Sequence, residues 1–132
     1  MILEEVSEEN KQEIKNWCDQ RGFAYLGDMF PKIGLIANKD DRYIAAWFMY
    51  TDLDNKIAWL AWQVANPDST QRERGTAFTK MYEMLAEVAK GLGIVFLVTN
   101  SHSTTEFGKK MEKLGFQPTD RDVTHYLKNL GE

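Results

Sequence analysis

The spacing of apolar residues changes along the chain from a helical period to a strand-like one. Across residues 7–21, the apolar side chains Ile14, Trp17 and Cys18 lie three and four positions apart. This spacing predicts an amphipathic helix with one buried stripe. Ser7 is a favourable N-cap for that helix, because its hydroxyl can accept a bond from a first-turn N–H.

Three short apolar runs follow the helix, and turn-forming residues separate them. The runs at 33–37, 43–50 and 57–64 predict strands, and their short connections predict antiparallel neighbours. The two longer runs are apolar at nearly every position, so we expect helices on both faces of the sheet. Residues 23–30, before the first run, fit either a loop or a short edge strand.

A β-α-β unit is predicted in the second half of the chain. Helical periodicity returns over 76–92, and the five consecutive apolar residues at 94–98 indicate a central strand buried on both sides. The capping-box spacing at 103–106 predicts another helix. A closing strand is predicted over residues 123–130. The order of elements predicts an α/β (α+β) fold with a mixed, mostly antiparallel sheet.

Composition narrows the class of protein. A chain of 132 residues fits a single domain over 1–132, with 43% hydrophobic and 27% charged residues. Its apolar runs are too short to cross a bilayer, and residues 1–6 do not resemble a secretory signal, so the expected location is the cytoplasm. A net charge of −4 argues against nucleic acid as a partner. The single cysteine, Cys18, excludes an intrachain disulfide and is expected in the core.

The segment Gln71-Arg72-Glu73-Arg74-Gly75-Thr76-Ala77 is the strongest candidate for chemistry. It stands between a predicted strand and the start of a predicted helix, where backbone N–H groups lack intrahelical partners and favour an anion. Gly75 lets the backbone approach a ligand, and the two arginines can pair with phosphate oxygens. The segment therefore predicts a diphosphate-binding turn.

The stretch Arg72-Glu73-Arg74-Gly75-Thr76-Ala77 also satisfies the Gln/Arg-x-x-Gly-x-Gly/Ala signature of the GNAT acetyltransferase superfamily. The later Glu112-Lys113-Leu114-Gly115-Phe116 is similar to the usual ending of that family's last helix. The segment Ile57 to Phe116 thus resembles the family's acyl-coenzyme-A-binding core. The resemblance implies a splayed central strand pair, acetyl-CoA as cosubstrate, and binding through Val64, Ala65, Arg72, Glu73, Arg74, Gly75, Thr76, Ala77 and Asn100.

Two positions depart from the family pattern. Many GNAT enzymes carry a tyrosine acid before the final Glu-Lys run, whereas this chain has Met111, which cannot donate a proton. The path from Pro67 to Arg72 is also longer than usual. His102, just after the predicted central strand, is the catalytic candidate, since a histidine serves as acid or base near neutral pH. The alternative interpretation is an exposed or capping histidine.

Three functional hypotheses follow. The first is an N-acyltransferase that moves acetyl or another short acyl group from coenzyme A to a primary amine of a small molecule or protein. The second is a catalytically inactive GNAT-shaped binding or structural module, of the kind that a virus could encode. The third is a sensor that binds coenzyme A without catalysis. No metal site is expected, because His125 has no companion ligands. The aromatic content is compatible with a homodimer.

Overall fold

The computed structural model describes residues 1–22, 30–101, 106–120, 124, 126, 128, 130 and 131. The chain divides into two compact units, Met1–Thr99 and Asn100–Glu132. The first unit carries β1 (Ile2–Glu5), α1 (Glu8–Gln20), β2 (Ile33–Lys39), β3 (Arg42–Asp52), β4 (Ile57–Ala65), α2 (Gln71–Gly91) and β5 (Phe96–Thr99). The second carries α3 (Glu106–Lys113). That 1–132 form one domain stays a prediction.

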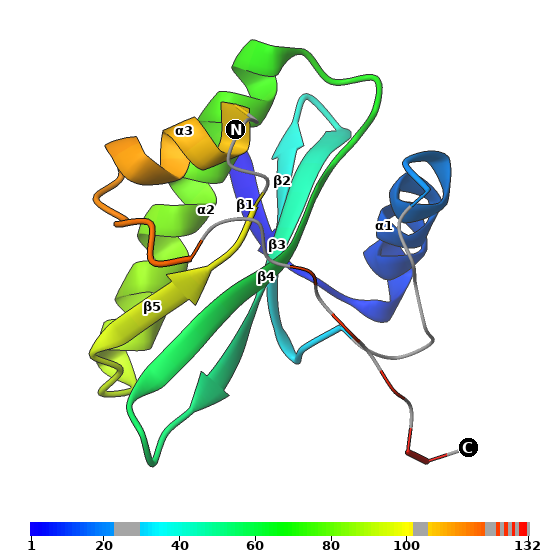
Figure 1. Cartoon of the computed structure of the whole chain (residues 1–132). Coiled ribbons are helices and arrows are strands. Elements are labelled where there is room, and N and C mark those ends of the chain that lie inside the picture. Colours follow the sequence, from blue (N-terminus) through cyan, green and yellow to red (C-terminus); the bar gives the residue numbers. More distant parts are fainter. Residues whose placement is uncertain are drawn as a thin grey trace. The chain divides into compact units, whose positions relative to one another are not determined.

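The five strands form one sheet in chain order, β1-β2-β3-β4-β5 (Figure 1). The first four are antiparallel neighbours, and β5 runs parallel to β4 after the α2 crossover. The predicted fold class, a mixed and mostly antiparallel sheet, is confirmed. β1 was not predicted, because its four residues are too short a run to show an alternating pattern.

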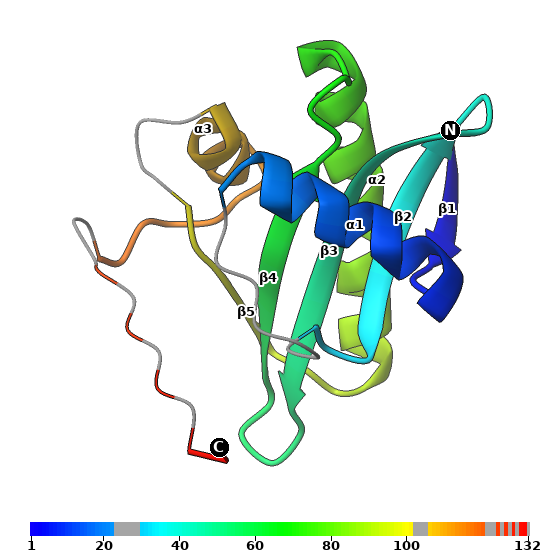
Figure 2. The same ribbon diagram turned by 90° about the vertical axis from the view of Figure 1, so that its right-hand side faces the viewer.

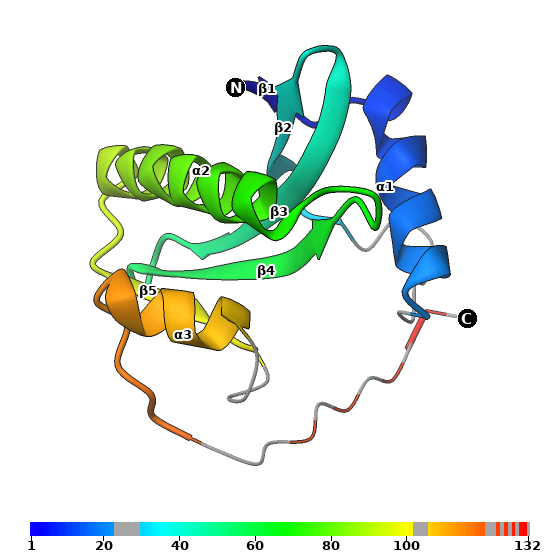
Figure 3. The same cartoon turned by 90° about the horizontal axis from the view of Figure 1, so that it is seen from above.

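Helices lie on both faces of the sheet, as the apolar strands predicted (Figure 3). Successive residues of β3 face opposite sides of the sheet. Phe48 belongs to the core cluster that includes Ile14, Trp17 and Cys18 of α1. Trp47, next along β3, meets Phe78 of α2 edge to face, with ring centroids 5.6 Å apart.

The α2 helix begins earlier than the sequence pattern indicated. The prediction placed its start near Thr76, whereas Thr70 is the N-cap and the helix begins at Gln71. The cause is a capping box, in which Thr70 and Glu73 satisfy each other's backbone N–H groups. The predicted phosphate-binding segment is therefore the first two turns of the helix.

The prediction that β5 is buried on both sides is wrong. Phe96 is 64% exposed and Val98 is 48% exposed. Both lie on the same face as their β4 partners Ile57 and Trp59, which are also partly exposed. A run of apolar residues cannot reveal whether a helix covers both faces, and α1 packs elsewhere on this side, against β4 near Val64.

The second unit contains a short helix with a glycine just after it. α3 ends at Lys113, and Gly115 has a φ of 97°, a left-handed conformation that glycine adopts without strain. Met111 is buried. Of the expected closing strand, residues 124, 126, 128 and 130 are described, and none lies in a strand. Its other residues, His125 included, lie outside the described residues, as do His102, the capping residues 103–105 and the 23–29 segment.

Among the described residues, no helix combines the length and the apolar character needed to span a membrane.

Candidate functional site

β5 pairs with only the first part of β4. The two strands pair from Ile57 with Phe96 to Leu60 with Thr99, and β4 then continues to Ala65. The Thr99 hydroxyl donates to the Leu60 backbone oxygen at 2.9 Å at the last pair. Figure 2 shows β4 and β5 separating toward their carboxyl ends. Among the described residues of the first unit, the stretch 61–65 has no strand partner on this side.

A β-bulge lies in this open stretch. Ala46 pairs with Val64 but Phe48 pairs with Ala61, so β4 has one more residue between these pairs than β3 has. Trp62 in the bulge has a φ of 58°, which is a strained conformation for a residue with a side chain. No glycine marks the position, so the sequence carried no signal for the bulge.

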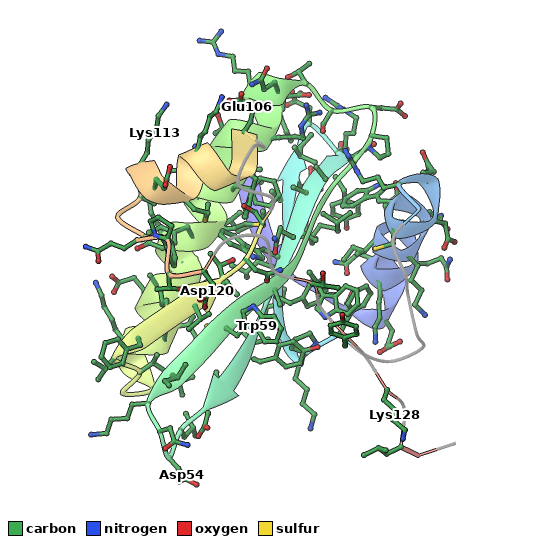
Figure 4. The ribbon with its side chains drawn as sticks, viewed as in Figure 1. Asp54, Trp59, Glu106, Lys113, Asp120 and Lys128 are labelled. Atoms are coloured by element: carbon green, nitrogen blue, oxygen red, sulfur yellow. The ribbon has the colours of Figure 1, made fainter. Side chains whose placement is uncertain are left out.

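Packing holds Trp62 in that conformation. Its indole N–H donates to the Tyr50 hydroxyl at 3.0 Å, and its ring meets Phe30 edge to face at a centroid distance of 5.5 Å. Tyr50 also contacts Trp59, one of the labelled side chains on β4 in Figure 4, with centroids 5.8 Å apart. The aromatic side chains therefore fix the bulge from the α1 face of the sheet.

The two residues predicted to bind the pantetheine arm differ in where their backbone groups point. The Asn66 N–H donates to Ile44 O at 2.8 Å, so the alternating ladder makes Ala65 a non-bonded partner of β3. The N–H and C=O of Ala65 thus face the open edge, whereas those of Val64 face β3. The Ala65 oxygen already accepts a bond from Arg21 Nε at 2.8 Å.

The start of α2 is capped by its own side chains. Thr70 Oγ1 accepts from the Glu73 N–H at 3.1 Å, and Glu73 Oε1 accepts from the Thr70 N–H at 2.9 Å. The Glu73 carboxylate also pairs with Arg42 and, at 3.6 Å, with Lys39. The hydrogen bond from Thr70, together with the charges of Arg42 and Lys39, lowers the pKa of Glu73 against the opposing effect of burial.

Few backbone donors remain for a ligand at this helix start. The Arg74 N–H donates to Thr70 O at 3.0 Å, and the N–H groups of residues 75–77 lie in the second turn, where they bond within the helix. The first-turn N–H groups of Gln71 and Arg72 have no intrahelical partner. They are the part of the predicted anion cradle that is available.

Several of the predicted cofactor-binding residues gather around one shallow cleft. The cleft has a volume of about 420 Å³ and is lined by Met1, Lys39, Thr70, Arg72, Glu73, Thr76 and Lys80. Arg74 is not among them, because its guanidinium donates to Ser69 O and, at 3.4 Å, to Ser69 Oγ. Asn100 follows β5 directly and belongs to the second unit. The roles of these residues and of His102 stay predictions.

Comparison with solved structures identifies the fold of this chain. No family model and no curated protein matches the sequence. Among solved structures, N-acetylglutamate synthase from Neisseria gonorrhoeae, complexed with coenzyme A and L-arginine, matches 95% of this chain at 16% identity and a TM-score of 0.70. An aminoglycoside N-acetyltransferase in complex with coenzyme A matches 97% of this chain and 99% of its own, at 16% identity and a TM-score of 0.65. This chain has the GNAT fold.

A further acetyltransferase structure also matches this chain. Ribosomal-protein-alanine N-acetyltransferase from Brucella melitensis biovar Abortus 2308 is 16% identical, with a TM-score of 0.64 over 98% of this chain and 99% of its own. The chain spans 29% of the gonococcal synthase chain, the first structure named above. At these identities the shared property is the GNAT fold, with its parallel strand pair β4–β5 and the helix between them.

Proposed function

We propose that this chain is an N-acyltransferase that moves an acetyl or other short acyl group from coenzyme A to a primary amine. The observation that carries the proposal is the open edge of β4, which leads to the start of α2 within a GNAT fold. Structures with the same fold are acetyltransferases crystallised with coenzyme A, which supports this choice of cosubstrate.

The residues of the open edge suit the amide-containing arm of coenzyme A. An extended ligand pairs with a strand edge through backbone hydrogen bonds, and Ala65 directs both its backbone groups to that edge. Its oxygen retains a lone pair beyond the bond from Arg21. At the end of this path, the N–H groups of Gln71 and Arg72 and the exposed Arg72 side chain offer donors for the diphosphate.

Acyl transfer depends mainly on how the protein positions the two substrates. Bound acyl-coenzyme A supplies an activated thioester, so the protein must hold the amine and the carbonyl carbon together. We propose that a backbone N–H of the β4 edge stabilises the oxyanion that develops. His102 is the proposed acid or base, because Met111, at the place of the family's usual tyrosine, cannot exchange a proton.

A proline substitution tests the diphosphate contact without disturbing the helix. Gln71 is the first residue of α2, where proline is well tolerated, and Thr70 before it has the extended backbone that proline requires. Gln71→Pro removes one N–H and should weaken acetyl-coenzyme A binding in calorimetry by about three- to ten-fold, while Gln71→Ala should not. Absence of binding by the unaltered chain at millimolar concentration would overturn the proposal.

Two contacts favour the second candidate, a GNAT-shaped module without catalysis. The Glu73 carboxylate stands at the helix start that a diphosphate would approach, and Arg21 already occupies the Ala65 oxygen. A thiol-release assay over a panel of primary amines separates the two candidates. Binding of coenzyme A with no thiol release would favour the module, whereas measurable turnover would eliminate it.

A further inference from the structure

Arg21, at the C-cap of α1, reaches a part of the fold far from it in sequence. Its Nε donates to the backbone oxygen of Ala65, 44 positions along the chain, at 2.8 Å. This is the only side-chain hydrogen bond or ion pair that Arg21 makes among the described residues. One of the five guanidinium N–H donors is therefore used to fix the group at the carboxyl end of β4, and four remain.

The Arg74 guanidinium is anchored on the same short connection. It donates to the backbone oxygen of Ser69, four residues after Ala65, and to the Ser69 hydroxyl at 3.4 Å. Arg21 thus binds the carbonyl group of the last residue of β4, and Arg74 binds that of Ser69 in the segment that follows.

Asn66 makes this connection rigid. The Ser69 N–H donates to Asn66 O at 3.0 Å, and the Asp68 N–H donates to Asn66 Oδ1 at 2.9 Å. The Asn66 side chain also donates to Tyr43 O on β3 at 2.9 Å. Asn66 and Ser69 are buried, so the connection offers a fixed base for the two guanidinium groups.

The guanidinium groups of this arginine pair, Arg21 and Arg74, form no ion pair within the part of the chain that the structure describes. Glu73, which precedes Arg74 in the sequence, is paired with Arg42 and Lys39 instead. Burial, followed by the charge of Arg74, lowers the pKa of Arg21, which agrees with two like charges held close together.

We propose that Arg21 and Arg74 together bind a diphosphate between the carboxyl end of β4 and the start of α2. That the diphosphate belongs to coenzyme A rests on the proposed function. Guanidinium groups match phosphate oxygens in a planar, two-bond geometry, and an anion between them removes their mutual repulsion. Arg74 lies within the family signature, but Arg21 comes from another helix and no motif identifies it. Arg21 is accordingly a binding residue that sequence alone did not reveal.

The test compares the full chain with Arg21→Gln, using inorganic pyrophosphate, coenzyme A and pantetheine as separate probes in calorimetry. The substitution should weaken both pyrophosphate and coenzyme A by about ten-fold and leave pantetheine, which has no phosphate, unchanged. Lys90→Gln is the matched control, since it removes one positive charge from the far end of α2. Arg21→Lys keeps the charge but loses the fork, and should show a smaller loss.

The outcomes separate this inference from the proposed function. If wild type binds coenzyme A and Arg21→Gln binds it and pyrophosphate equally well, the Arg21 site is overturned and the acyltransferase proposal stands. An equal loss in Lys90→Gln would also overturn the site, because it would reflect net charge alone. If pyrophosphate binding depends on Arg21 but coenzyme A does not bind, the diphosphate site stands and the acyltransferase proposal fails. If Arg21→Gln does not fold, the affinities of Arg21→Lys for pyrophosphate and coenzyme A are compared with those of wild type instead.

Discussion

Thr70 and Glu73 exchange hydrogen bonds across the first turn of α2, each side chain accepting from the backbone N–H of the other. This pairing places the predicted phosphate-binding segment inside the helix. It also brings a carboxylate to the helix start, where a negatively charged group interacts favourably with the helix dipole. The same residues therefore stabilise the fold and limit how an anionic cosubstrate can approach.

Thr70→Ala should lower the free energy of unfolding by about 1 kcal/mol, because the Glu73 N–H loses its acceptor at the N-cap. Thr70→Ser keeps a hydroxyl at that position and should stay close to wild type. Urea denaturation at neutral pH measures both values. Equal stability of Thr70→Ala and wild type would contradict the capping box.

Glu73→Gln should bind coenzyme A several-fold more tightly than wild type. Glutamine can still accept the Thr70 N–H bond, but it removes the negative charge beside the diphosphate and releases Arg42 and Lys39. Glu87→Gln, at the far end of α2, is the control for a change of net charge. Equal affinity of Glu73→Gln and wild type would show that the carboxylate does not oppose the ligand.

The Glu73 carboxylate should make the stability of the fold depend on pH. Because the folded protein lowers the pKa of Glu73, its charged form stabilises the fold above the ordinary glutamate pKa of about 4.3. That contribution is lost as the pH falls through the lowered value. Thermal unfolding from pH 7 to pH 3 should show wild type more stable than Glu73→Gln at neutral pH, with the difference shrinking in acid. A difference that is constant over this range is the contrary result.

The Cys18 thiol should resist modification in the folded protein. It is 1% exposed, and burial, aided by the charge of Asp19, raises its pKa, so little thiolate is present at neutral pH. A chromogenic disulfide reagent should react with it only after denaturant is added. Rapid reaction of the native chain would show that α1 does not pack on the sheet as described. A silent Cys18 also allows thiol-release assays to be read without background.

Local patterns were sufficient to predict most of the sheet and α1. The apolar runs at 33–37, 43–50 and 57–64 correspond to β2, β3 and β4, whose observed bounds differ by a few residues. The short connections between them carry local turn signals, so their antiparallel order was also predictable. The start of α2 was misplaced although a local signal existed, since Thr70 and Glu73 have the spacing of a capping box.

The candidate site was predictable only where its residues are close together in the sequence. Residues 71–77 lie at the expected junction of strand and helix, because the β-α-β pattern fixes that junction. The contacts of Arg21 with Ala65 and of Arg42 with Glu73 join residues that are 44 and 31 positions apart. Such pairs leave no periodic signal, and the strained bulge at Trp62 depends on the packing of Tyr50 and Phe30 rather than on its own residue type.

Coenzyme A should lie along the open edge of β4 and reach the start of α2. The sharpest test is a titration of ¹⁵N-labelled protein with coenzyme A, followed through backbone amide shifts. We expect the largest changes on residues 61–65 and on Gln71 and Arg72, with little change along β1 and β2. Saturating coenzyme A that shifts none of these amides, or shifts mainly those of β1 and β2, would contradict this placement.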